Sequence, residues 1–429
     1  MNSKRCEFLI VGSGAGGATL ARELSRQSKD VIVVERGAPA KQVGNFKASL
    51  TFFDANKLTK VPRKSKEGVI LWRTLMAGGS TVVSCGNATR CLEQELGEFG
   101  IVLDREFAEA ESEMHVAPIA ETLLSEGSEA ILQASTALGY DMQLMPKFVD
   151  ADNCKQCGQC IFGCPHHAKW TAVDYLDEAA ANGVEILYDT VIDRVLVENE
   201  SAYGVRGSGP NGAVEIQSDV TILAAGGFGT PVILQRSGIE DAGKGLFIDL
   251  LVNTYGVTDG LNLSHEPTMA LVDHEFHDER RFILSPYVNH AKMPRFMELG
   301  AKGFALSDRN LLGIMTKTAD DPAGQVFADG TVSKPVTVDD QARLDDGATI
   351  AEEILVKAGA DRNSIVTSNP QGAHPGGTAA VGKIVDENLR TRLDNLYVCD
   401  SSVLPVAPGL PPILTIVALA KRLARRLTA

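Results

Sequence analysis

Short apolar runs that end at glycine or at a carboxylate recur along this chain, with amphipathic segments between them. The first run, Phe8 to Val11, meets a glycine-rich turn and then a segment with helical periodicity. The run "DVIVV" ends at Glu35, another opens the segment 220–239, and "NLYV" is followed by Asp400. Apolar runs of this length without alternation are typical of strands buried on both faces of a parallel sheet. The pattern therefore predicts an α/β fold.

The first turn has the glycine spacing of a dinucleotide site. Gly12 permits the tight turn, Gly14 lets the backbone approach a pyrophosphate, and Gly17 lets the helix pack closely on the strand. The start of the following helix then faces the phosphates. Glu35, eighteen residues after Gly17, can bind a ribose hydroxyl. Strand, turn, helix and strand in this order predict a bound dinucleotide.

Length and charge narrow the classes of protein. The 429 residues can form two domains or one large interrupted domain. The formal net charge of -14 argues against a nucleic-acid partner, which needs clustered Lys and Arg. No window has the roughly 18 apolar residues of a membrane span. We therefore expect a cytoplasmic protein without a membrane span, in a compartment that keeps thiols reduced.

Four cysteines lie close together in "NCKQCGQCIFGCP". Their spacing, followed by Pro165, is that of the bacterial ferredoxin run, and Gly158 and Gly163 can supply its tight turns. The run predicts a [4Fe–4S] cluster near the dinucleotide, with the following ligands: Cys154, Cys157, Cys160 and Cys164.

The cysteine run leaves alternatives open. One such run guarantees only three ligands to one cluster, so the fourth is either Cys164 or a remote thiol, with Cys85 and Cys91 as candidates. Zinc is a second possibility, although structural zinc sites usually separate their cysteine pairs by more residues. Thiols or disulfides without a metal are a third.

Several segments together resemble the glucose–methanol–choline (GMC) family of flavin oxidoreductases, especially its long-chain alcohol oxidase and cholesterol oxidase relatives. "AGGSTVVSCGN" is similar to the family's glycine-rich stretch beside the flavin, and "GGFGTPVILQRSGIE" to a family signature, from which Gly227 and Glu240 depart. "HPGGTAAVG" resembles the block that carries the catalytic histidine, and the segment from Asn395 to Leu427 resembles the C-terminal block. The matches follow the family's order over almost the whole chain.

The resemblance implies FAD as the dinucleotide and a Rossmann-like FAD-binding domain of the glutathione-reductase type, joined to a smaller α+β substrate domain on an antiparallel sheet. The FAD-binding domain is assigned to 1–145, 171–245 and 365–429, a cysteine-rich iron–sulfur insert to 146–170, and the substrate domain to 246–364. "RRFILSPYVNHAK" and "NLLGIMTKTADD" are expected to form strands of the antiparallel sheet. The resemblance implies these FAD-binding residues: Gly12, Gly14, Gly17, Glu35, Gly78, Gly79, Ser80, Asp400 and, through its backbone, Val191.

Oxidation of an alcohol by a flavin needs a group that takes the hydroxyl proton. His374 is the candidate, because imidazole titrates near neutral pH and its loop can hold the ring against the flavin. The family pairs this histidine with a second His or Asn, but Pro411 stands at that position and offers no side-chain hydrogen bond. The candidates for the second role are His265, His290, Tyr287 and Asn369.

The expected function is therefore an FAD-dependent dehydrogenase that oxidises the CH–OH group of a small-molecule alcohol. Its electrons are expected to leave through the cluster to a ferredoxin, an electron-transfer flavoprotein or a quinone-linked carrier. One alternative is a flavin and iron–sulfur enzyme that desaturates or reduces a C–C bond, which would explain Pro411. Another is an electron-transfer subunit that relays electrons for a partner's chemistry.

Overall fold

The apolar runs form the centre of a seven-stranded sheet in the computed structural model, which describes residues 2–56 and 62–429. In this sheet β1 lies between β2 and β10, and the order is β7-β2-β1-β10-β9-β8, with β20 also paired to β10. The pairs among β7, β2, β1, β10 and β20 are parallel, whereas β9 pairs antiparallel with β10 and β8. The strands are β1 (Asn2–Val11), β2 (Val31–Val34), β7 (Glu185–Leu187), β8 (Val191–Glu198), β9 (Ser201–Gly209), β10 (Gly212–Leu223) and β20 (Leu396–Val398).

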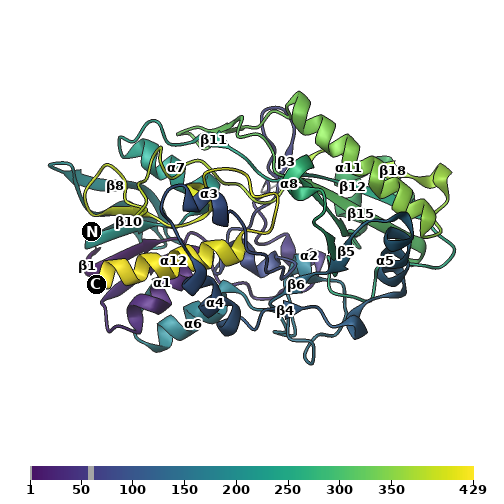
Figure 1. Ribbon diagram of the computed structural model, residues 1–429. Helices are drawn as coiled ribbons and strands as arrows, with labels where there is room; N and C mark the ends of the chain where they lie inside the picture. The colour runs from purple at the N-terminus through teal and green to yellow at the C-terminus, as the bar shows by residue number, and fades with distance from the viewer. Residues whose placement is uncertain (1, 57–61) are drawn as a thin grey trace.

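Helices from distant parts of the chain cover this sheet. Helix α1 (Ala15–Ser25) starts at the glycine turn and packs against α6 (Ala172–Ala181) and α12 (Ile413–Thr428). In Figure 1 the yellow C-terminal helix α12 lies beside the purple N-terminal helix α1, and α4 (Asp104–Glu113) packs on α12. None of the helices in the described residues is both long enough and apolar enough to span a membrane.

A second sheet forms the other lobe in Figure 1 and has the order β3-β19-β12-β15-β14-β13-β5, with β18 also paired to β12. Its pairs are antiparallel except β3 with β19. Helix α11 (Val338–Lys357) packs on β12 and β15, and α5 (Glu126–Leu138) packs on α11. The strands are β3 (Ile70–Leu71), β5 (Met142–Leu144), β12 (Leu250–Val257), β13 (Leu271–Asp273), β14 (Phe282–Pro286), β15 (Leu311–Thr318), β18 (Val366–Thr367) and β19 (Gln371–Gly372).

The two segments predicted as strands of the antiparallel sheet are confirmed, because they contain β14 and β15, which pair with each other. Every residue of both strands is buried. The sheet also takes strands from outside 246–364, namely β3, β5, β18 and β19. The second sheet is therefore not built from residues 246–364 alone, because segments before and after this range add strands to it.

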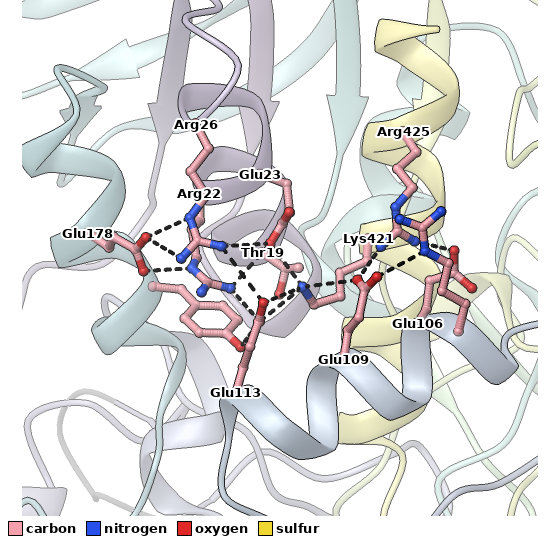
Figure 2. A network of polar contacts seen from close by, with 12 residues as sticks. Thr19, Arg22, Glu23, Arg26, Glu106, Glu109, Glu113, Glu178, Lys421 and Arg425 are labelled. Atoms are coloured by element: carbon pink, nitrogen blue, oxygen red, sulfur yellow. Dashed lines mark hydrogen bonds and ion pairs between the residues drawn. The ribbon is translucent and has the colours of Figure 1, made fainter.

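A network of ion pairs ties together the helices on the first sheet (Figure 2). Lys421 of α12 is buried, and its Nζ lies 3.1 Å from Glu23 of α1 and 3.0 Å from Glu113 of α4. Arg22 of α1 donates to Glu113 at 2.6 Å and to Glu178 of α6 at 2.6 Å. Four helices thus meet at two buried cations, and removal of one cation would leave carboxylates without their partner.

The pairing also changes the ionisation of Glu113. Burial opposes its charged form, but hydrogen bonds from Arg22 and Lys421 outweigh burial and lower the pKa to about 2. Because this pKa lies below that of the unfolded chain, the stabilisation is present above the unfolded pKa of 4.5. It is lost as the pH falls from there through the folded pKa.

We predict that Lys421→Met lowers the free energy of unfolding by about 3 kcal/mol at neutral pH, because it breaks a buried ion pair. The control is Arg105→Ala, whose side chain is 72% exposed in its pair with Glu109 and should cost at most about 0.5 kcal/mol. Urea denaturation measures both. The difference between wild type and Lys421→Met should shrink between about pH 5 and pH 2, and a difference that is constant with pH would contradict this account.

Candidate active site

One cavity of about 590 Å³ joins the two lobes. Its lining includes the turn between β1 and α1, the end of β2 at Glu35, and the start of α7 (Gly226–Arg236). The lining continues to β12 and β15 of the second sheet and to the loop that carries His374. The predicted dinucleotide site and the predicted catalytic histidine therefore share one cavity.

The glycine turn has the geometry that its spacing predicts. Gly12 has a φ of +108°, and a Cβ there would lie 2.2 Å from the carbonyl oxygen of Ala224 on the next strand. A Cβ on Gly17 would lie 2.0 Å from the Gly12 oxygen, so this glycine brings helix and strand together. A Cβ on Gly14 would meet no atom of the chain within 4 Å. Gly14 thus opens onto the cavity, as close approach of a ligand requires.

Glu35 is linked to this turn by hydrogen bonds. Its carboxylate accepts from the Ser13 N–H at 2.9 Å, the Ser13 hydroxyl at 2.6 Å and the Gly37 N–H at 2.7 Å. The Ser13 hydroxyl in turn accepts from the N–H of Gly78 at 3.2 Å. Burial raises the pKa of Glu35, which these hydrogen bonds oppose. The glycine turn, Glu35 and the stretch at 77–87 are therefore one connected unit.

Two buried lysines hold the stretch at 77–87 in place. The Nζ of Lys147 donates to the carbonyl oxygens of Cys85 at 2.9 Å and Thr268 at 3.0 Å. The Nζ of Lys169 donates to the carbonyl oxygen of Val82 at 2.9 Å. Burial lowers the pKa of Lys147 to about 8. Hydrogen bonds from these ammonium groups to backbone carbonyl oxygens hold the loop beside the cavity.

Asp400 follows β20 and faces the start of α7. Its carboxylate accepts from the N–H of Gly226 at 2.8 Å, the Thr230 hydroxyl at 2.5 Å and the N–H of Ser402 at 2.7 Å. Burial raises its pKa, and the hydrogen bonds lower it. Asp400 therefore lies at the carboxyl edge of the parallel sheet, on the same edge as the glycine turn.

Seven of the nine residues predicted to bind FAD line the cavity. Gly17 and Gly78 do not line it among the described residues; Gly17 acts through helix packing, and Gly78 through its bond to Ser13. Val191 is the first residue of β8 and lines the cavity together with its neighbours Thr190 and Ile192. The seven are Gly12, Gly14, Glu35, Gly79, Ser80, Val191 and Asp400.

His374 has a partner that the sequence did not reveal. Its Nδ1 lies 2.8 Å from Oδ2 of Asp249, whose side chain is fully buried just before β12. The other carboxylate oxygen of Asp249 accepts from the N–H of Gly409 at 3.0 Å. A carboxylate at Nδ1 holds the proton there and leaves Nε2 as the free acceptor. Burial and the nearby cation of Lys317 lower the pKa of His374, although Asp249 raises it.

Pro411 lines the cavity, as the family resemblance implies for its position. Of the four candidates for the second catalytic role, Tyr287 lines the cavity, and burial raises its pKa well above the usual value. His265, His290 and Asn369 do not line the cavity as far as the structure describes the chain. His265 and Asn369 are exposed. Lys317 does line the cavity, and its signal in the sequence was a lysine within the apolar strand "LLGIMTKT".

The cysteine loop borders the cavity through Ile161 and Phe162. Its two glycines form the predicted turns, with a φ of +65° at Gly158 and +89° at Gly163. In the part of the chain that the structure describes, however, no three His, Cys, Asp or Glu side chains are arranged to hold a metal ion. The predicted cluster is therefore not supported by this arrangement of the thiols Cys154, Cys157, Cys160 and Cys164, which are all free.

The two remote thiols do not resemble cluster ligands either. Burial raises the pKa of Cys85 to about 11 and that of Cys91 to about 12. The Sγ of Cys91 lies 3.1 Å from the hydroxyl of Thr415 in α12. Because the thiolate is the form that binds a metal, neutral buried thiols are poorly suited to that role.

Comparison with known proteins identifies the class of this chain. The N-terminal GMC oxidoreductase model matches residues 6–263, and the C-terminal GMC oxidoreductase model matches residues 313–420. The chain therefore belongs to the GMC oxidoreductase family. It is an FAD-dependent oxidoreductase, as the sequence predicted.

Relatives span the chain from end to end. An uncharacterised protein of Methanocaldococcus jannaschii is 30% identical over 98% of this chain and 99% of its own length. A long-chain-alcohol oxidase of Arabidopsis thaliana is 23% identical over 96% of this chain and 65% of its own length. Among solved structures, a pyridoxine 4-oxidase has a TM-score of 0.76 at 17% identity over 99% of both chains. A formate oxidase has a TM-score of 0.77 at 14% identity, covering 100% of this chain and 99% of its own. The two structures share the mixed α/β fold of this protein.

Proposed function

We propose that this protein oxidises the CH–OH group of a small-molecule alcohol with FAD as its cofactor. The observation that carries the proposal is the position of His374, which lines the same cavity as the glycine turn and is held at Nδ1 by Asp249. Similarity to a long-chain-alcohol oxidase and a pyridoxine 4-oxidase supports an alcohol as the substrate class.

The residues around the cavity fit FAD. The open space at Gly14 suits a pyrophosphate, and two carboxylates, Glu35 and Asp400, stand at strand ends where ribose and ribitol hydroxyls can donate to them. Gly79, whose Cβ would lie 3.2 Å from the Cα of Gly14, brings a second backbone stretch beside the turn. When bound, FAD supplies an acceptor for the hydride of the alcohol.

His374 takes the hydroxyl proton in this proposal. Its lowered pKa keeps the imidazole neutral at physiological pH, and Asp249 fixes the tautomer that has a free Nε2. As the proton moves to Nε2, the carboxylate of Asp249 stabilises the imidazolium that forms. Asp249 therefore acts as a positioning residue through His374.

The glycine turn gives a test of FAD binding. We predict that Gly14→Ala folds with a melting temperature like that of wild-type apoprotein, because its Cβ meets nothing within 4 Å, but loses most bound FAD. Gly12→Ala should instead destabilise the fold, because its Cβ would lie 2.2 Å from the Ala224 oxygen at a positive φ. Flavin absorbance and thermal unfolding measure the two effects. A Gly14→Ala protein with full flavin content would contradict the assigned pyrophosphate position.

The pair of His374 and Asp249 gives a test of the chemistry. We predict that His374→Ala retains FAD but reduces it with an alcohol about 1,000-fold more slowly, the usual scale for loss of a general base. Asp249→Asn should slow the same step. It should also shift the acidic limb of the pH–rate profile to lower pH, because the carboxylate of Asp249 raises the pKa of His374. Since the neutral imidazole is the active form, wild-type flavin reduction should rise with pH through the pKa of His374.

Anaerobic stopped-flow reduction with a panel of alcohols and of saturated carbonyl compounds separates the rival functions. Flavin reduction only by C–C bond donors would indicate a desaturase. An unchanged rate of substrate-dependent reduction in His374→Ala would favour an electron-transfer subunit. Either result would exclude alcohol oxidation through His374.

Electron transfer through a [4Fe–4S] cluster to an external carrier remains a prediction from the cysteine spacing, and the arrangement of the thiols does not support it. On the sequence prediction, anaerobically prepared protein contains about four irons and four sulfides, and Cys157→Ser loses them. Metal analysis of the two proteins decides this. Stoichiometric zinc, or no metal with full turnover, would make the loop a purely structural element beside the cavity.

A further inference from the structure

Lys317 is a buried charged residue of the cavity lining to which the proposed mechanism gives no role. It lies near the end of β15, where its Cα pairs with Leu251 of β12 and Ile283 of β14. Alternate residues of a strand share a face. Met315 and Lys317 both line the cavity, as does Leu251 directly opposite Lys317. The lysine therefore belongs to the face that the second sheet turns toward the cofactor site.

The ammonium group of Lys317 has no hydrogen-bond partner in the described residues, although the side chain is only 1% exposed. Buried lysines elsewhere in the described chain do have partners. Their acceptors are carbonyl oxygens or carboxylates, and these lysines are Lys147, Lys169, Lys334 and Lys421. Burial of an ammonium group without a partner is costly. An unpaired cation retained in a cavity therefore points to an oxygen atom of a ligand.

The groups that face Lys317 do not neutralise it. Burial lowers its pKa to about 8, and negative charge on Asp249, Cys91 and Cys85 would raise it. Both oxygens of Asp249 already accept hydrogen bonds, from His374 and Gly409, and both thiols are kept protonated by burial. His274 and His374 are the other titratable neighbours, and the charge of Lys317 lowers the pKa of each. Lys317 is therefore mainly cationic at neutral pH.

We propose that Lys317 is the second catalytic group of the alcohol site and binds the hydroxyl oxygen of the substrate, an inference that rests on the proposed function. Pro411 has no donor to offer at the position where the family places the second group, and Lys317 supplies one from the opposite sheet. In the reaction the O–H and C–H bonds of the alcohol break and a C=O bond forms. The proton goes to Nε2 of His374, and the hydride takes both electrons to FAD. Lys317 keeps its protons and stabilises the negative charge that develops on oxygen.

The first test compares two buried lysines of the same lobe. Lys317→Met should retain FAD and reduce it with alcohol at least 100-fold more slowly, the effect of removing one donor to a developing oxyanion. Its melting temperature should equal or exceed that of wild type, because an unpaired buried charge is replaced by an apolar chain of similar length. The control Lys334→Met loses a 2.8 Å pair with Asp320 and should melt earlier, with normal flavin reduction per folded, FAD-loaded protein. A Lys317→Met protein that is destabilised but reduces flavin at the wild-type rate would show a purely structural lysine.

A second test does not require the natural substrate. Acetate, a small carboxylate, should bind beside Lys317 in oxidised holoenzyme and perturb the flavin absorbance in a saturable way. Lys317→Met should weaken this binding at least tenfold, whereas Lys334→Met should not. If no alcohol reduces wild-type flavin, the proposed function fails and the acetate titration still decides the role of Lys317. No acetate binding to wild type, or equal binding to Lys317→Met, would overturn the assignment.

The pH dependence gives a third readout. Flavin reduction by wild type should fall as the pH rises through about 8, where Lys317 loses its proton. In Lys317→Met the rate of flavin reduction should no longer fall at high pH. It should still rise with pH at low pH, where His374 loses its proton. An upper limb unchanged in Lys317→Met would assign it to another group.

Discussion

The close approach of backbone segments at the start of α1 is the constraint on which the site depends. A Cβ at Gly12 would lie 2.2 Å from the Ala224 oxygen, and a Cβ at Gly16 would lie 1.9 Å from the Cys399 oxygen. These contacts bring the ends of β1, β10 and β20 to one point beneath the helix. Asp400 is the residue after Cys399 and Gly226 begins α7, so the same contacts place both beside the turn.

The first sheet supplies the glycine turn and the carboxylates of Glu35 and Asp400, and the second sheet supplies Lys317 to the same cavity. Asp249 lies just before β12 and Lys317 lies within β15. Both side chains are buried, as are all residues of β15 and all but the last residue of β12, so neither charge can relax into water. Glu298 is similarly buried and accepts from the Tyr255 hydroxyl at 2.7 Å and from the Asn253 amide at 3.3 Å. Buried polar groups of this kind cost stability unless they are hydrogen-bonded. Charges held at buried positions act more strongly on a bound ligand than charges in water do.

The cysteine loop shows why spacing alone does not define a metal site. Positive φ angles at Gly158 and Gly163 agree with the turns of a ligating run, so the local backbone matches the pattern. A cluster also needs thiolates that converge on one point, and the described side chains do not provide such a group. Convergence depends on how the loop packs against its surroundings. Here Gly163 packs on Val43 and Gly158 lies beside His290, both contacts with distant segments.

The sequence by itself determined the elements whose cause is local. The glycine spacing specified the turn and its opening at Gly14, and the uninterrupted apolar runs specified the parallel strands, because steric limits and burial act over a few residues. Only the tertiary structure decided which charges meet at the site. Asp249 and His374 are 125 residues apart, and the lysine in "LLGIMTKT" carries no sign in the sequence of which residues it will lie beside. Their proximity follows from sheet register and loop packing, which no local pattern encodes.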